Sequence, residues 1–480
     1  MTPTWFLVFP DDVAISTEAG GEFVLLGPQA RVTLPQLSPG LQAALNRLVP
    51  SGERVDVLAE SILAADGPAA LARWYYFLQQ LTQRGLLLLT AQTQARRLAT
   101  LVPLSSTFVL NPRGPLPDRS YVLSRFAYIR RDGDGLVLES PLGPARLLLH
   151  DDRATGLVHA LGRPGSLAEL ALRTPGSGVE AVRQMLGLLL SADMAREVSE
   201  EGTTVEDTEP ALRIWEFHDL LYHCRSREGR HDAPVGATYH WAGKLPAPPA
   251  LQPAADDGID LHRPDLEQLQ RQDPPLALVQ EKRRSLRDYA PEPLTAQQLG
   301  EFLFRVARVR SCREVEIDTA AGPQQVEFTS RPYPAGGGLY ELELYPVIQS
   351  CRDLVPGLYH YEPRHHRLEP RAGLTADVLR LVREAAQASG TAPEHVQVLL
   401  IVAARYPRLA WKYSTLAYAL VLKHVGVLYQ SMYLNATAMG LAPCALGDGN
   451  SDLFARAAGT DYYAETSVGE FLLGSRPPDE

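Results

Sequence analysis

Apolar runs and helical periodicity alternate along the first 200 residues, and the same order of elements occurs twice. In residues 1–100, strands are expected at 5–9 and 22–26, joined by a turn at 19–21, then helices near 38–48, 55–64 and 67–84 and a strand at 85–90. In residues 120–200, strands are expected near 121–130, 135–139 and 145–149, helices near 153–161, 166–173 and 179–191, and a closing segment at 193–198. A strand pair followed by helices and a returning strand is typical of a winged helix.

The second half of the chain carries a different pattern. Thr295, followed three residues later by Gln298, predicts the N-terminus of a helix within 293–309. The unbroken apolar run at 396–403 predicts a central strand that is buried on both faces. Further strands are expected at 339–348, 357–363 and 464–474, and further helices near 275–284 and over about 413–440.

Composition narrows the class of protein. A chain of 480 residues is expected to form two to four domains, and 45% hydrophobic with 21% charged residues indicates a globular protein. The net charge of −10 argues against a nucleic-acid partner. The four cysteines are scattered and the first residues do not resemble a signal peptide, so we expect a cytoplasmic protein without disulfides. Lys423, His424 and Asn435 interrupt the apolar run at 413–442, which favours a buried helix over a membrane span.

The two winged-helix-like units leave three roles open. DNA binding is disfavoured because the expected second helices carry few arginines that could contact bases. Peptide docking by addition of a strand to a sheet edge is one alternative, and a purely structural scaffold is the other.

Residues 199–256 are expected to connect the two halves. The acidic, turn-rich stretch 199–210 predicts a linker, and the Pro- and Ala-rich stretch 244–256 predicts an extended connector over the surface. Between them lie His218, His223, Cys224 and His231. Their spacing matches no standard zinc pattern, so a helix and a basic loop are favoured over a metal site.

Three motifs in the second half suit a flavin mononucleotide (FMN). An arginine cluster lies at 281–289, EKRRSLRDY, and arginines bind phosphate by charge-assisted hydrogen bonds. The run RPYPAGGGLYELELYP at 331–346 places three glycines before a strand, and glycine lets a backbone approach a flat ring closely. A second glycine-rich loop, ALGDGN, occupies 445–450.

These motifs resemble a known family, the FMN-dependent azoline dehydrogenases of SagB and cyanobactin-oxidase type in the nitroreductase superfamily. The resemblance covers about 281–474, and more faintly 214–240, and rests on RRSLR at 283–287, RPYPAGGGLYELELYPV at 331–347, GLYHYEPRHHRLE at 357–369, WKY at 411–413 and YLNATAMGLAPCALGDGNSDLF at 433–454. It implies an α+β protein with a nitroreductase-like FMN-binding oxidase domain at 271–480. Two winged-helix-like units, similar to peptide recognition elements, are expected at 1–104 and 105–200, with a linker and connector segment at 201–270.

The resemblance also implies the site residues. Lys412 and Tyr413 match the family's catalytic pair, with Lys412 as the candidate base. The expected cofactor-binding residues are Arg283, Arg284, Ser285 and Arg287 for the phosphate and ribityl chain, Pro334, Ala335, Gly336 and Gly337 along the flavin, Leu446, Gly447 and Asp448 at the flavin ring, and Arg476 to complete the phosphate site. No metal is expected.

The implied reaction oxidises thiazoline or oxazoline rings of a ribosomally made peptide to thiazoles or oxazoles, with hydride transfer to the flavin and reoxidation by O2. The implied partners are an azoline-containing precursor peptide, a cyclodehydratase and a second copy of the chain in a homodimer, without nucleic acid or membrane. Two alternatives stay open: an NAD(P)H-dependent nitro- or ene-reductase of the same superfamily, and a non-catalytic peptide-binding scaffold.

Overall fold

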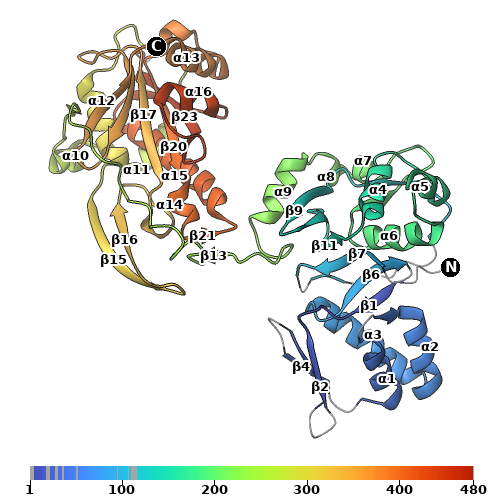
Figure 1. Cartoon of the computed structure of the whole chain (residues 1–480). Coiled ribbons are helices and arrows are strands. Elements are labelled where there is room, and N and C mark those ends of the chain that lie inside the picture. The colour runs from blue at the N-terminus through green and yellow to red at the C-terminus, as the bar shows by residue number, and fades with distance from the viewer. Residues whose placement is uncertain are drawn as a thin grey trace. The chain divides into compact units, whose positions relative to one another are not determined.

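The computed structural model describes residues 5–17, 22–27, 31–34, 37–49, 52–93, 96–105, 107–109 and 116–478. The chain divides into two compact units, Met1–Ala233 and Pro234–Glu480, each built around its own seven-stranded sheet (Figure 1). Both units combine helices and antiparallel strands, so the predicted α+β class is confirmed.

The first unit contains one continuous antiparallel sheet that spans both predicted winged-helix-like segments. Its strand order is β5-β1-β6-β7-β11-β10-β9. The bounds are β1 Phe6–Val8, β5 Glu53–Arg54, β6 Leu88–Thr93, β7 Arg96–Pro103, β9 Tyr128–Asp132, β10 Gly135–Glu139 and β11 Ala145–Leu149. The two segments join where β7 pairs with β11, with Leu101 opposite Leu147. They therefore share one sheet.

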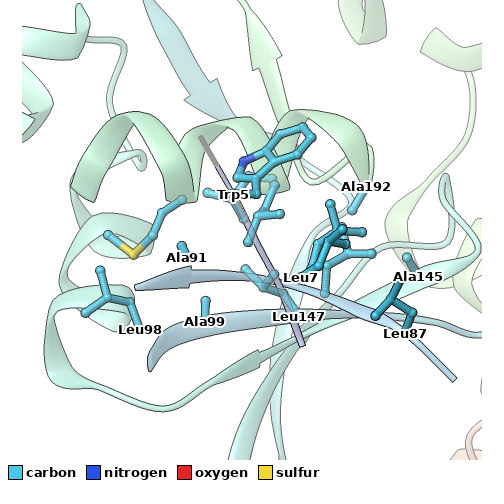
Figure 2. Close-up of a cluster of buried hydrophobic side chains, with 14 of the residues drawn as sticks. Trp5, Leu7, Leu87, Ala91, Leu98, Ala99, Ala145, Leu147 and Ala192 are labelled. Carbon is cyan, nitrogen blue, oxygen red and sulfur yellow. The ribbon is translucent and has the colours of Figure 1, made fainter. Parts of the chain in front are cut away.

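The helices of this unit follow the predicted order. They are α1 Pro39–Arg47, α2 Val55–Asp66, α3 Pro68–Gln83, α4 Asp152–Ala160, α5 Leu167–Arg173 and α6 Val179–Ser191. The core also crosses the two segments: Trp5, Leu7, Ala99 and Leu147 belong to one buried cluster (Figure 2), and the Trp5 indole N–H donates to the carbonyl of Gln184 at 3.1 Å. Since these side chains bury one another, we expect the two segments to fold as a single cooperative unit.

The strand pairing near the N-terminus differs from the prediction. A strand that was not predicted, β2 Ala14–Thr17, pairs with β3 Phe23–Leu26, which pairs with β4 Arg31–Leu34 in a separate three-stranded sheet. β1 instead pairs with β5 and β6, which lie far from it in sequence. The predicted turn at 19–21 lies outside the described residues.

The segment at 199–210, predicted to be a linker, is ordered and partly buried. A capping box of Thr204 and Asp207 begins α7 Val205–Thr208, and α8 Pro210–Arg213 and α9 Phe217–Arg225 follow. The carboxylate of Glu206 is buried, accepts from the Ser124 hydroxyl at 2.6 Å and pairs with Arg196 at 2.8 Å. The stretch predicted as a linker thus contains short helices and lies within the first compact unit. A two-stranded ladder of β8 Tyr121–Leu123 and β12 Ala195–Glu197 completes the unit.

The sheet of the second unit has the order β14-β19-β18-β17-β20-β23-β22, and all its described pairings are antiparallel. The bounds are β14 Ile259–Asp260, β17 Leu342–Ile348, β18 Gly357–Glu362, β19 Arg367–Ala372, β20 Val398–Arg405, β22 Leu441–Leu446 and β23 Glu465–Ser475. β20 is buried along almost its whole length, as its unbroken apolar sequence predicts. It divides two cores, because its even-numbered residues pack with Leu342 and Leu344 and its odd-numbered ones with Tyr345 and Val347.

Helices cover both faces of this sheet. α12 Ala296–Ala307 and α15 Ala417–Ala438 contribute to the core on one face, and α13 Ala376–Ser389 and α16 Ser451–Ala458 to the core on the other. Short helices are α10 Leu266–Gln272, α11 Leu276–Lys282 and α14 Tyr406–Ala410. The predicted capping box of Thr295 and Gln298 is confirmed at the start of α12. Among the described helices, none is long and apolar enough to cross a membrane.

A hairpin that was not predicted, β15 Ser311–Thr319 and β16 Gly322–Ser330, projects from the body of the second unit (Figure 1). The connector at 244–256 contains no helix or strand, as expected, but side chains of the sheet hold it in place. The Arg405 guanidinium donates to the carbonyls of Pro249 and Ala250, and Glu369 accepts from the backbone N–H of Ala255 at 2.6 Å. These bonds fix the path of the chain from residue 249 to residue 255.

Candidate functional site

The triple glycine lies against Lys412 and Tyr413. Gly336–Gly338 form one 3-10 turn in which Gly337 and Gly338 have φ of 59° and 70°, a region that favours glycine. A Cβ atom on Gly337 would lie 2.5 Å from Lys412 Nζ and 2.7 Å from the Tyr413 hydroxyl. Two motifs that are 75 residues apart in sequence thus meet, and the glycine leaves room for their close approach.

His424 of α15 holds the same turn from the other side. The backbone N–H of Gly336 donates to His424 Nε2 at 2.8 Å, and His424 Nδ1 lies 2.7 Å from Glu341 Oε1. Because Nε2 accepts a hydrogen bond, Nδ1 carries the proton and donates to the fully buried Glu341. Sequence reasoning missed this role. The available signal was a histidine inside a largely apolar helix.

Lys412 is half-buried in an aromatic surrounding. Its Nζ lies 5.6 Å from the ring centroids of Tyr239 and Phe328 and 5.3 Å from that of Tyr413. No ion pair of Lys412 occurs among the described residues. Burial, and less strongly the charge of Arg408, lowers the pKa of Lys412. Burial raises the pKa of Tyr413. Lys412 is therefore a candidate proton acceptor.

Tyr239 reaches Lys412 through a short ribbon that sequence reasoning did not predict. β13 Gly236–Ala237 pairs with β21 Tyr413–Ser414, and the backbone N–H of Tyr239 donates to the Lys412 carbonyl at 3.0 Å. The Tyr239 ring packs edge-on against Trp411, whose indole N–H donates to Leu245. The connector thus forms one wall of the Lys412 environment.

The arginine cluster lies beside the other end of α15. The Ser285 hydroxyl is hydrogen-bonded to the Tyr433 hydroxyl at 2.7 Å, and the Arg283 guanidinium lies 5.1 Å from the centre of the Tyr433 ring. Arg284 and Arg287 are exposed, and neither forms a salt bridge within the described part of the chain. Arg476 follows β23 and is half-buried. The backbone brings Arg476 near the cluster, because the N–H of Ala290, which directly follows the cluster, donates to the carbonyl of Ser475 at 3.1 Å.

The second glycine-rich loop lies between these two ends. Leu446 ends β22, and Gly447 and Asp448 line a cavity of about 470 Å³ together with Val425 and Tyr429 of α15. A larger cavity of about 730 Å³ lies on the α13 side of the same loop. Lys412, His424 and Ser285 all lie on α15, in the segment before it or in contact with it. We therefore assign the candidate site to the cavity that α15 lines, and not to the cavity on the α13 side.

Glu470 is a further residue of this loop region that sequence reasoning missed. It lies opposite Leu446 on β23, is only 8% exposed, and lines both cavities. Burial, with a smaller contribution from the charge of Asp448, raises the pKa of Glu470 to about 7. A Cβ atom on Gly449 would collide with the Glu470 carboxylate, so this glycine makes room for a buried acid.

Successive residues of α15 therefore contact the three predicted motifs in turn. His424 contacts Gly336, Val425 and Tyr429 face Leu446 to Asp448, and Tyr433 contacts Ser285. From residue 424 to residue 433 an α-helix rises about 13.5 Å. Ala335 lies half-buried beside the same core and accepts from the backbone N–H of Gly338, whereas Pro334 is exposed. No direct contact joins the arginine cluster to Lys412 among the described contacts.

Comparison with known families agrees with this arrangement. Residues 281–474 match the model of the nitroreductase family, residues 121–232 that of cyanobactin oxidase ThcOx, and residues 1–111 that of the ThcOx helix turn helix domain. The predicted resemblance is confirmed. The last match also places a helix-turn-helix domain where the first winged-helix-like unit was expected.

Individual relatives match about half of the chain or less. A protein of Methanocaldococcus jannaschii named "Putative nitroreductase MJ1384" is 28% identical over 195 residues, which is 40% of this chain and 85% of that protein. The microcin B17-processing protein McbC of Escherichia coli is 29% identical over 137 residues, 28% of this chain and 49% of McbC, so the match spans about half of McbC. The crystal structure of a "putative nitroreductase" from Ralstonia eutropha has 21% identity and a TM-score of 0.35, over 52% of this chain and 99% of that one. The chain thus carries a nitroreductase-family domain at 281–474, preceded by segments that match cyanobactin oxidase ThcOx and its helix-turn-helix domain.

Proposed function

We propose that this protein is an FMN-dependent oxidase that converts thiazoline or oxazoline rings of a ribosomally made peptide into thiazoles or oxazoles. The observation that carries the proposal is the close packing of Lys412 and Tyr413 against Gly337, in a glycine turn that is bonded to α15, the helix that also reaches the arginine cluster. The matches to cyanobactin oxidase ThcOx and to a microcin-processing protein support a peptide substrate over a small nitro compound.

The residues fit FMN at two points. Arg284 and Arg287 are exposed, form no salt bridge within the described residues and flank the Ser285–Tyr433 contact in sequence, so they suit a phosphate dianion together with Arg283 and Arg476. Gly336, Gly337, Gly447 and the half-buried Ala335 offer backbone without bulky side chains to a ring, and Leu446 and Asp448 line the adjoining cavity. Exposed Pro334 precedes this turn and completes the proposed wall.

When bound, FMN would accept the two electrons that aromatisation releases, and O2 would reoxidise it. The chain's own part is to hold the peptide ring and to accept a proton. Loss of a hydride from one ring carbon leaves a proton on the neighbouring carbon, and the Lys412 amine accepts it. The lowered pKa of Lys412 increases the fraction of free amine near neutral pH, and Tyr413 orients that amine.

The first unit has a distinct proposed role, the binding of the precursor peptide. The separate sheet β2-β3-β4 leaves β2 and β4 with one unpaired edge each among the described strands. An extended peptide can add a strand to such an edge. A homodimer and association with a cyclodehydratase belong to the same proposal.

The test uses full-length protein loaded with FMN and a peptide that carries one thiazoline, incubated in air. We expect the peptide to lose two mass units per ring. A control with NADPH and no peptide separates the reductase alternative: rapid bleaching of the flavin together with an unchanged peptide mass would contradict the proposal.

A further inference from the structure

A further cavity of the second unit is lined by arginines and by none of the proposed flavin-binding residues. It has a volume of about 310 Å³ and lies at the turn between β18 and β19, beside the C-terminal end of α12. In the strand order, β18 and β19 are separated from β22 and β23 by β17 and β20. Because none of its lining residues belongs to the proposed oxidase site either, the cavity is a different site.

Four guanidinium groups line this cavity: those of Arg263, Arg308, Arg310 and Arg364. None of them forms a salt bridge with any residue that the structure describes. Two are held in position by the chain, because Arg263 donates to the carbonyl of His365 at 2.5 Å and Arg308 donates to that of Phe304 at 2.9 Å. Two cationic side chains are thus pre-positioned without an anionic partner.

The acidic residues near the cavity already form hydrogen bonds or ion pairs with other groups of the protein. Glu362 is buried and accepts from the backbone N–H groups of Arg364 and His365 at 2.8 and 2.7 Å. Asp265 caps α10, and Asp273 pairs with Arg305. No aspartate or glutamate lines the cavity itself. In a chain with a net charge of −10, this is a local surplus of positive charge.

The surplus of positive charge contributes to lowered pKa values of two side chains at the cavity. Burial, and then the charge of Arg310, lowers the pKa of Arg308. Burial, together with the charges of Arg263 and Arg308, lowers the pKa of His366 to about 4. His366 is buried, with Nδ1 2.8 Å from the Tyr361 hydroxyl and Nε2 2.9 Å from the His262 carbonyl. It is therefore neutral and adds no charge.

The remaining walls of the cavity are apolar. Phe304 packs under Arg308, with 4.3 Å from the guanidinium to the ring centre, and edge-on against His366. Leu266, Val309 and Pro363 complete this side. A bound anion would therefore have an apolar surface beside it.

We propose that this cavity binds a small organic phosphate, with the phosphoryl group among the four arginines and the apolar part against Phe304. A dianion compensates more of the surplus charge than a carboxylate does, and the planar guanidinium group binds phosphate oxygens in pairs. The volume lies at the lower end of ligand pockets, which favours a small ligand over a dinucleotide.

Isothermal titration of the full-length, stoichiometrically FMN-loaded protein tests the proposal. The ligands are phenyl phosphate, inorganic phosphate and benzoate. We expect saturable binding of phenyl phosphate, weaker binding of inorganic phosphate, and the weakest binding of benzoate. Absence of saturation with phenyl phosphate up to about 10 mM would overturn the proposal, and benzoate binding as tightly as phenyl phosphate would overturn the choice of a phosphate.

Variants then locate the site. Arg310→Gln with Arg364→Gln changes two exposed side chains and is expected to weaken phenyl phosphate binding at least about tenfold, with flavin content unchanged. The matched control, Arg352→Gln with Arg383→Gln, removes the same charge from exposed positions elsewhere and should bind like the wild type. Equal weakening in both double variants would contradict the assignment, because it would reveal a nonspecific effect of net charge. Flavin content distinguishes a failure here from a failure of the proposed oxidase function.

Discussion

The two ends of α15 differ in how their polar groups are satisfied. At the N-terminal end, the protein itself satisfies Gly336, His424 and Glu341 by a chain of hydrogen bonds, and Lys412 lies among aromatic rings. At the C-terminal end, Ser285 is bonded to Tyr433, but Arg284 and Arg287 are exposed and have no salt bridge in the described part of the chain.

This difference indicates which end is built for chemistry and which for binding. Groups that are pre-organised and partly desolvated have shifted pKa values, as Lys412 does. Exposed arginines without a partner keep their charge available for a ligand. We therefore expect substitutions at the first end to change the reaction and those at the second to change cofactor affinity, and the predictions below test that separation.

The largest expected effect follows from Lys412→Ala. The variant should fold and bind FMN like the wild type, yet aromatise an azoline peptide about 10²–10⁴-fold more slowly, since it lacks the proton acceptor. Mass spectrometry of the peptide and flavin absorbance on the same sample measure the two quantities. Lys423→Ala, an exposed lysine on α15, is the matched control. Near wild-type turnover in Lys412→Ala would exclude this lysine as the base.

The complementary change is Arg284→Ala with Arg287→Ala. Each lost charge-assisted hydrogen bond is worth about 1.5–3 kcal/mol, so the FMN dissociation constant should rise by about two orders of magnitude or more. Residual activity at saturating FMN should stay close to that of the wild type, because Lys412 is untouched. Equilibrium dialysis gives the affinity. A double variant that retains as much flavin as the wild type would show that these arginines do not hold the phosphate.

Features that depend on neighbouring residues were predicted more reliably than features that depend on residues far apart in the sequence. The capping box of Thr295 and the apolar run of β20 depend on neighbouring residues and are confirmed. The β15–β16 hairpin was missed because its strands are largely polar and exposed, and the apolar alternation is short, with Val315 and Ile317 on one strand and Val326 and Phe328 on the other. The pairing of β1 with β6 was missed because the partners are about 80 residues apart.

The candidate site follows the same rule. Glycine runs and the arginine cluster are visible as motifs, but His424 meets Glu341 across 83 positions, and Tyr239 reaches Lys412 from a segment predicted to be only part of a connector. Glu470 lies in a strand sequence without any motif, and only the fold buries its carboxylate. Such residues emerge from packing, which a single sequence does not display.

Glu470 provides the next test, on stability. Its folded pKa of about 7 lies above the ordinary value of 4.5, so the folded state favours the protonated carboxyl. The stability contribution is fully present below pH 4.5 and is lost as the pH rises through 7. Relative to Glu470→Gln, the wild type should lose about 2–3 kcal/mol of unfolding free energy between pH 4.5 and 8.

Urea denaturation at several pH values measures this difference. The exposed Glu394→Gln variant serves as control and should follow the wild-type profile. Parallel profiles for the wild type and Glu470→Gln would mean that the Glu470 carboxylate is solvated, and the cavity beside Gly447 would then hold no buried acid.

The peptide-docking role of the first unit gives a smaller, separable effect. A truncated protein that begins at Pro234 should retain the second unit's fold, because that unit has its own core. It should bind a leader-bearing peptide at least about tenfold more weakly than the full chain does, while turnover of a short leaderless peptide stays similar. Circular dichroism and flavin content verify folding. Equal affinities of the two proteins would leave only a structural role for residues 1–233.

The smallest expected effect concerns the aromatic wall of Lys412. The Tyr239 ring lies 5.6 Å from Nζ, and such a ring stabilises an ammonium by about 0.5–1 kcal/mol, which equals roughly 0.4–0.7 pKa units. Tyr239→Leu keeps an apolar cover but removes the π face, so the pKa of Lys412 should fall further. The rising limb of the pH–rate profile would then move to lower pH by that amount, because the free amine is the active form. Tyr239→Phe keeps the ring and should leave the limb in place. An unchanged limb in Tyr239→Leu, with Lys412→Ala inactive, would show that burial alone sets the basicity of Lys412.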